Sequence, residues 1–146
     1  MTIETLIENF QLLGEWEERY AYLMDLGKKL PGLSAEEKVE ANRVHGCQAM
    51  VWLTLKTDAA GAGRFRINAD SDAFVVRGLI SVLLMLFDGR TAEEIARVDA
   101  RAAFSQLGLD RHLSPTRKNG LFAMVERIWT LASAANSRAQ TSPIPS

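Results

Sequence analysis

The sequence predicts an α+β fold in which a small antiparallel sheet of two or three strands is covered by several helices. Apolar residues alternate with a period of two in adjacent runs near the middle of the chain, whereas helical spacing prevails before and after them. The chain has 146 residues, of which 47% are hydrophobic, so it can bury one sizeable core. We expect one domain over residues 1–138 and a disordered tail over residues 139–146, which hold two prolines and no aromatic residue.

The N-terminal part of the chain predicts two helices, at about residues 2–13 and 15–29, because apolar residues recur there at helical spacing. Gly14 separates the two helices. The second helix ends at the Leu-Pro-Gly sequence of residues 30–32, since proline cannot continue a helix and glycine permits a turn. Residues 34–37 (Ser-Ala-Glu-Glu) have the spacing of a capping box, so a further helix of one or two turns is expected there.

Two runs of alternating apolar residues predict an antiparallel hairpin. The first run begins at Met50 and places three apolar residues on one face: Val51, Leu53 and Leu55. A loop containing two glycines leads to a second run, in which three apolar residues share a face: Phe65, Ile67 and Ala69. Arg43 and Val44 are predicted to add a short third strand.

Residues 73–87 are apolar on nearly every side, and Ser71 and Asp72 mark the start of this segment. A helix with so little polar surface is expected to be the central one, packed on the sheet. Three further helices are predicted from residues that favour helix ends. Their positions are a capping box at residues 91–94, a helix from Asp99 to Gly108, and a last helix from Ser114 and Pro115 to near Arg138.

Composition excludes several classes of protein. The formal net charge of −1 provides no general attraction to nucleic acid or to anionic membranes. The most apolar stretch, residues 79–87, is far shorter than the roughly 20 residues that span a bilayer. One cysteine cannot form an internal disulfide, and the N-terminus has no features of a signal peptide, so a cytoplasmic location is expected.

Cys47 is the candidate reactive group. It lies in a loop between a charged segment and a strand, where Gly46 permits a tight turn and His45 can polarise the thiol. The reactive form is the thiolate, and a free cysteine has a pKa of about 8.5, so reactivity near neutral pH needs a nearby positive group. The alternative is a small buried apolar side chain, which is the commoner role of an isolated cysteine beside an apolar strand.

Other chemistries have less support. A zinc site would need Cys47, the two histidines His45 and His112, and a carboxylate from distant segments, so no metal site is expected. A Cys-His hydrolase would have His112 as its base, but no local signature accompanies it. Dithiol redox chemistry within one chain is excluded, because there is no second thiol. A single thiol can, however, accept a group and hold it for a partner.

The residues around Cys47 resemble the cysteine loop of the SufE family of sulfur acceptors, whose pattern is Gly-Cys-x-Ser-x-Val-Trp. This sequence reads Gly-Cys-Gln-Ala-Met-Val-Trp over residues 46–52, so that Ala49 stands where the family has serine. Three other stretches agree with the family in order and spacing: residues 22–31, 70–79 and 112–121. The resemblance covers roughly residues 5–135.

The resemblance implies a fold similar to the IscU scaffold and a cytoplasmic accessory protein of iron–sulfur cluster assembly. Family members accept sulfane sulfur from a cysteine desulfurase of the SufS or CsdA type, stimulate that enzyme, and pass the sulfur to a scaffold complex. They act as sulfur-transfer accessory proteins rather than as stand-alone enzymes. No cofactor of the chain itself is implied, because the pyridoxal phosphate belongs to the desulfurase. The sequence leaves open both which desulfurase is the partner and whether the chain forms a homodimer.

In this family Cys47 is the implied acceptor, which becomes a persulfide. Supporting or partner-binding roles are implied for five residues: His45, Gly46, Gln48, Asp72 and Arg117. The competing interpretations are a plain helix cap for Asp72 and a surface charge for Arg117. We expect the loop to swing outward on docking and, at rest, to shelter the sulfur in an apolar pocket lined by Trp52 and the central helix. The alternative function is a non-catalytic interaction module in which Cys47 is structural.

Overall fold

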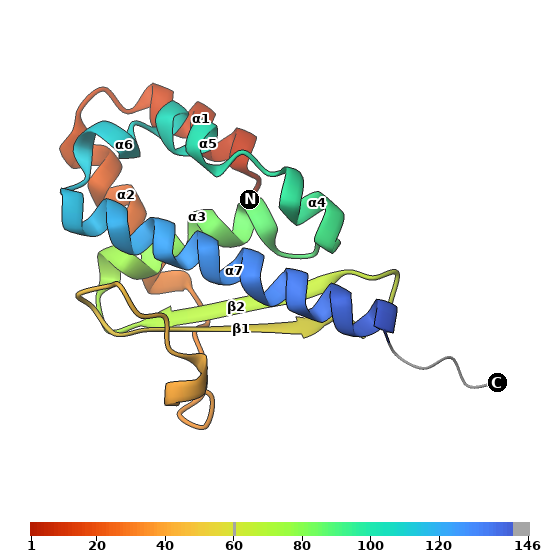
Figure 1. Ribbon diagram of the computed structural model, residues 1–146. Helices are drawn as coiled ribbons and strands as arrows, with labels where there is room; N and C mark the ends of the chain where they lie inside the picture. Colours follow the sequence, from red (N-terminus) through yellow and green to blue (C-terminus); the bar gives the residue numbers. More distant parts are fainter. Residues whose placement is uncertain (60, 142–146) are drawn as a thin grey trace.

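The computed structural model describes residues 1–59 and 61–141, with side chains as far as residue 137, and has the expected α+β architecture (Figure 1). Within these residues, β1 (Val51–Thr57) and β2 (Phe65–Ser71) form a two-stranded antiparallel sheet. Val51 pairs with Ser71 at one end and Thr57 with Phe65 at the other. The helices in chain order are α1 (Ile3–Leu12), α2 (Trp16–Lys29), the 3-10 helix η1 (Glu40–Asn42), α3 (Phe74–Phe87), α4 (Ala92–Arg97), α5 (Ala100–Leu107), α6 (Leu109–His112) and α7 (Pro115–Thr141).

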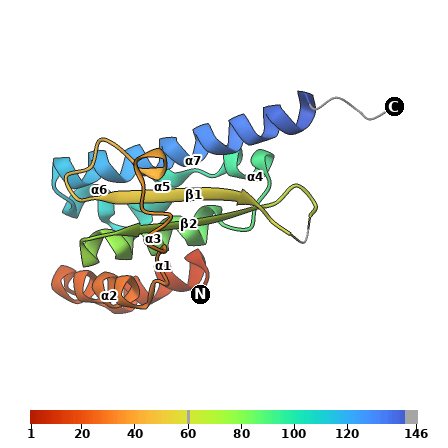
Figure 2. The ribbon, with the colours of Figure 1, turned by 90° about the horizontal axis from the view of Figure 1, so that it is seen from below.

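One face of the sheet is covered by two helices, with α3 against β2 and α7 along β1. Figure 1 shows α1 and α5 at the end of the core farthest from the sheet. Seen from below, the segment that carries η1 crosses the other face of the sheet, over β1 (Figure 2). The core therefore lies on one side of the sheet, and a single irregular segment covers part of the other side.

The central position predicted for residues 73–87 is confirmed, because nine of the 14 residues of α3 are buried. α3 also packs closely on α2. Two glycines, Gly27 and Gly78, permit this contact, since a Cβ atom at either position would collide with the backbone of the other helix. The alternation predicted for the strands is confirmed too. Leu55 is partly buried and packs against the core, and the other predicted core-face residues are buried: Val51, Leu53, Phe65, Ile67 and Ala69.

The helix ends predicted from capping residues are present. Thr91 and Glu94 form a complete capping box, in which the Thr91 hydroxyl accepts from the Glu94 amide and the Glu94 side chain accepts from the Thr91 amide. The Asp99 side chain caps α5, which ends at Gly108 with φ of 78°. Ser114 Oγ accepts from the Arg117 amide at the start of α7.

Two predictions on either side of η1 were wrong. Residues 34–37 form one turn rather than a helix, although Ser34 and Glu37 do interact. Side chains at this turn bind the strands, which favours the turn over a helix: Glu37 pairs with Lys56 of β1, and Lys38 pairs with Asp70 of β2. Arg43 does not belong to a third strand but makes a single antiparallel bridge with Trp52.

The last two helices also differ from expectation. The sequence did not predict α6, a single turn that immediately follows the left-handed Gly108. Helix α7 continues to Thr141, past the expected end near Arg138. Of the expected tail over residues 139–146, residues 142–146 lie outside the described part of the chain.

An ionic cluster joins the sheet to α3 and to the end of α2. Asp70 is buried, forms an ion pair with Arg77 of α3, and binds Lys38 at 3.1 Å. Arg77 also donates from Nε to the Gly27 carbonyl at 2.9 Å and from Nη2 to the Leu30 carbonyl at 2.6 Å. Asp70 and Arg77 therefore hold together β2, α3, the end of α2 and the segment that follows it.

Candidate functional site

Cys47 lies in a loop between the bridge residue Arg43 and strand β1. The Val44 amide donates to the Val51 carbonyl at 2.9 Å, which brings the two arms of the loop together. We call residues 45–50 the cysteine loop. At Gly46 the backbone has φ of 97°, a conformation that favours glycine. The geometry is that of a loop whose base is closed by a backbone hydrogen bond next to the start of β1.

Asp72 anchors the C-terminal arm of the cysteine loop. Its Oδ1 accepts from the Met50 amide at 3.1 Å, and its own amide donates to the Met50 carbonyl at 3.4 Å. It does not cap α3, whose N-cap is Ala73 and has no side-chain cap. The structure therefore places Asp72 as a link between the end of β2 and the cysteine loop.

The side chain of Cys47 borders a cavity of about 110 Å³ between the loop, α3 and the first turns of α7. Four large apolar side chains line this cavity: Val76, Leu79, Leu121 and Met124. Gln48, Ala49, Ser114, Thr116, Arg117 and Gly120 complete the lining. The expectation of an apolar pocket with central-helix residues in its wall therefore agrees with the structure.

Trp52 does not belong to this cavity, contrary to the sequence-based expectation. The side chains of a strand alternate between its faces, and the neighbours Val51 and Leu53 occupy the core face. The indole of Trp52 lies instead beside the segment that crosses the outer face, with the Lys38 ammonium 5.7 Å from its ring centroid. Trp52 thus fixes that segment and does not shelter the sulfur.

The Cys47 thiol is half-buried and donates to the Gly120 carbonyl, with 3.5 Å between Sγ and O. Burial raises the pKa of the thiol, because the thiolate loses hydration in this position. The neutral thiol is therefore the favoured form in this position. Since the thiolate is the nucleophile, burial holds the sulfur in its less reactive form.

Arg117 is the charged residue among those that line the cavity. It is partly buried, and its Nη1 donates to the hydroxyl of Tyr20 on α2 at 2.7 Å. This bond joins two helices that are distant in sequence and fixes the guanidinium at the cavity. Arg117 is thus more than a surface charge. Its guanidinium is permanently charged, which is the property required of a counter-charge for a thiolate or a persulfide.

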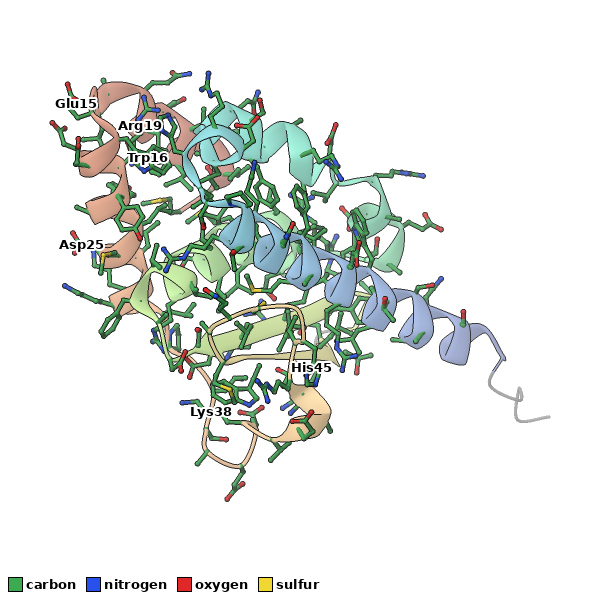
Figure 3. The ribbon with its side chains drawn as sticks, turned by 60° about the vertical axis from the view of Figure 1, so that its left-hand side comes forward. Glu15, Trp16, Arg19, Asp25, Lys38 and His45 are labelled. Carbon is green, nitrogen blue, oxygen red and sulfur yellow. The ribbon has the colours of Figure 1, made fainter. Side chains whose placement is uncertain are left out.

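Neither histidine is among the residues that line the cavity. His45 is exposed, and its Nε2 lies 2.7 Å from Glu40 Oε1. His112 stacks on Trp16 with ring centroids 4.3 Å apart, and Figure 3 shows His45 and Trp16 well separated. Within the described residues, no group of three or more potential ligands could hold a metal ion. Neither the zinc site nor a Cys-His pair with His112 receives support from this arrangement.

Comparison with known proteins decides the family. A model of SufE, the Fe-S metabolism associated domain, matches residues 4–132. The chain belongs to the SufE family. Membership assigns it a role in iron–sulfur metabolism and confirms the resemblance seen in the sequence.

Comparison with solved structures finds the same overall fold in another protein. The chain is similar to the solution structure of a hypothetical protein from Thermus thermophilus, with a TM-score of 0.73 and 23% sequence identity. The match covers 94% of this chain and 99% of the other. Within the described residues, no helix combines the length and the apolar character needed to cross a bilayer.

Two residues of this SufE chain are part of the site but were not among the expected site residues. Gly120 contacts Cys47 directly, and Tyr20 holds Arg117. A glycine in the interior of the last helix was the available signal for Gly120, because glycine is unfavourable there without a packing reason. Nothing in the sequence pointed to Tyr20, because the contact spans 97 positions. Ala49, which replaces the family serine, lines the cavity and leaves its wall less polar.

Proposed function

We propose that Cys47 accepts sulfane sulfur from the persulfide of a pyridoxal-phosphate-dependent cysteine desulfurase and carries it to an iron–sulfur cluster assembly scaffold. The observation that supports this most is the position of the thiol: it lies in a loop tied at its base, beside a cavity with a cationic residue in its lining. Membership of the SufE family supplies the metabolic setting. The chain would act as a sulfur-transfer accessory protein in the cytoplasm, with no cofactor of its own.

The transfer is a thiol exchange in which sulfur is the group that moves. The Cys47 thiolate attacks the outer sulfur of the desulfurase persulfide, and a new S–S bond forms on Cys47. The S–S bond of the partner breaks, and the partner's cysteine leaves as a thiolate. One sulfane sulfur changes carrier, so the step needs no external oxidant or reductant.

The cavity offers space for the sulfur that is acquired. A cavity needs a volume of about 10–15 Å³ to hold one water molecule, whereas this cavity has about 110 Å³. A terminal persulfide sulfur beside Cys47 would have apolar side chains on one side, which limit access of water and reductants. Arg117 would provide a counter-charge when the persulfide is ionised.

Uptake of the sulfur requires the loop to leave the cavity. A half-buried thiol with a raised pKa reacts slowly, so attack on the partner persulfide needs the loop to open on docking. The hydrogen bonds of Val44 with Val51 and of Met50 with Asp72 hold the base of the loop, so the movement would be confined to residues 45–49. His45, Gly46 and Gln48 are exposed on the loop and would be the residues that meet the desulfurase.

A second function is an interaction module in which Cys47 is structural. The observation in its favour is the bond from the thiol to the Gly120 carbonyl, which is ordinary packing for a buried cysteine. Turnover of the desulfurase distinguishes the two functions. The proposal expects the wild type to increase alanine formation from cysteine without added reductant, and Cys47→Ser to have no such effect. Equal stimulation by Cys47→Ser would favour the interaction module.

A further inference from the structure

The atoms nearest to the side-chain position of Gly120 belong to Cys47. A Cβ atom built at Gly120 would have three nearest neighbours, and all belong to Cys47: Sγ at 3.3 Å, Cβ at 3.6 Å and Cα at 3.7 Å. Gly27 and Gly78 differ, because their absent side chains make room for the permanent contact between α2 and α3. The space left at Gly120 is occupied by the cysteine loop, which is the part of the site that must move.

The backbone of α7 gives no other reason for a glycine at this position. Gly120 lies within α7 and is absent from the glycines with positive φ, so a residue with a side chain fits its conformation. Glycine also disfavours the helix relative to alanine. Its effect on the site is therefore steric, and it acts only while the loop is closed.

We propose that Gly120 is a positioning residue that sets the closed position of the cysteine loop, so that its missing side chain decides how the Cys47 thiol divides between sheltered and exposed states. This inference deepens the proposed function and rests on it for its biological use. In the closed state the thiol reaches the Gly120 carbonyl and donates to it. A methyl group at position 120 would lie 3.3 Å from Sγ, which is closer than most contacts of a Cβ atom, so Cys47 would have to shift by a few tenths of an ångström. On this proposal the shift is outward and weakens the closed position of the loop.

The same contact links loop position to protonation. A thiol can donate to the Gly120 carbonyl, whereas a thiolate has no proton and would face the negative end of the carbonyl dipole. From α7, Arg117 is the charged group at the cavity, and α3 contributes the apolar Val76 and Leu79. From the loop side, His45 is exposed and paired with Glu40, and Asp72 is bound to Met50. Loss of the proton therefore favours opening, with Arg117 as the group that opposes it.

The test uses the purified chain without any partner. We expect Gly120→Ala to increase the rate of Cys47 alkylation by iodoacetamide about three- to tenfold and to move the midpoint of its pH profile downward, toward that of a free cysteine. The matched control is Asn119→Ala, which makes a similar change in helix propensity at an exposed neighbour in α7. A rate within about twofold of wild type and an unchanged midpoint would overturn the inference.

A second measurement distinguishes a direct contact between residues 47 and 120 from a general change in stability. Replacing Cys47 with alanine removes Sγ and leaves neighbours at 3.6 and 3.7 Å, which is ordinary contact distance. We therefore expect Gly120→Ala to raise the thermal midpoint more in the Cys47→Ala background than in the wild type. Equal effects in both backgrounds would show that the two residues do not interact, and this result would also overturn the inference.

The test of Gly120 can succeed or fail independently of the proposed function. Alkylation and thermal unfolding need no desulfurase, so they decide the role of Gly120 even if the chain takes up no sulfur. If the proposed function holds, persulfide on Gly120→Ala should be lost to a thiol reductant faster than persulfide on the wild type. Equal loss from both proteins would contradict a sheltering role for the closed loop.

Discussion

The Cys47 thiol lies in an environment that favours its protonated form. It is half-buried, its proton is directed to the Gly120 carbonyl, and the cavity beside it is largely apolar. Arg117 also lines the cavity and donates a hydrogen bond to Tyr20. Under the proposed function its permanent charge would act in the opposite direction, by stabilising an ionised persulfide.

The pH dependence of alkylation follows from this environment. Because burial raises the thiol pKa, we expect the alkylation rate of the native chain to rise only at a pH above the free-cysteine value of about 8.5. The raised pKa also means that Cys47 contributes to folding stability below that pH and that this contribution is lost as the pH increases further. Iodoacetamide kinetics measure the midpoint, with the chain in denaturant as control. Coincident midpoints would contradict the burial of the thiol.

The substitution Tyr20→Phe tests the hydrogen bond between Tyr20 and Arg117. The substitution removes the hydroxyl that accepts from Arg117, so we expect a loss of about 1 kcal/mol in the free energy of unfolding and slower sulfur uptake. Tyr22→Phe is the matched control, because its hydroxyl accepts from Asn9 away from the cavity. If both variants slowed uptake equally, the position of Arg117 would not matter.

At the scale of elements, the cysteine loop combines a base next to β1 with a tip that contacts α7. Sequence alone predicted β1, β2 and the central helix, since alternation and apolar periodicity are local properties. It also placed Cys47 in a loop before β1. It could not show that α7 lies against that loop, because the contact between Cys47 and Gly120 spans 73 positions. The failed helix at residues 34–37 has the same origin, since its side chains bind partners on the strands.

The anchor at Asp72 can be tested separately from the thiol. Asp72→Ala removes the acceptor for the Met50 amide, so we expect alkylation of Cys47 about two- to fivefold faster and a loss of about 1 kcal/mol in unfolding free energy. Asp72→Asn keeps an acceptor oxygen and should remain near wild type. If Asp72→Asn behaved like Asp72→Ala, the charge of Asp72 rather than this bond would control the loop.

For the whole molecule, the ionic cluster at Asp70 supports the sheet, the end of α2, and α3, which borders the cavity. Burial by itself would raise the pKa of Asp70, but hydrogen bonds from the Leu33 amide, Lys38 and the Ser71 amide, together with the charge of Arg77, outweigh it and lower the pKa. A carboxylate with a lowered pKa contributes stability above its unfolded pKa of about 3.9, and this contribution is lost as the pH falls through the folded value.

Asp70→Asn tests this cluster. The change leaves Arg77 partly buried without its counter-ion, so we expect a loss of about 3–5 kcal/mol in unfolding free energy at neutral pH. The difference from wild type should shrink in acid, where the wild-type carboxylate also becomes protonated. Asp25→Asn, at an exposed position of α2, is the control and should change little. Denaturant unfolding at neutral and acidic pH measures both effects, and a pH-independent difference would contradict the charge-based account.

The central claim is that Cys47 carries sulfur, and the intact mass of the chain tests it most directly. The chain is incubated with a cysteine desulfurase and cysteine, separated from the enzyme without reductant, and weighed by mass spectrometry. We expect the wild type to gain the mass of one sulfur atom and to lose it on treatment with a thiol reductant. Cys47→Ser should gain none. A wild type that stays unmodified, or a Cys47→Ser protein that gains the same mass, would contradict the account.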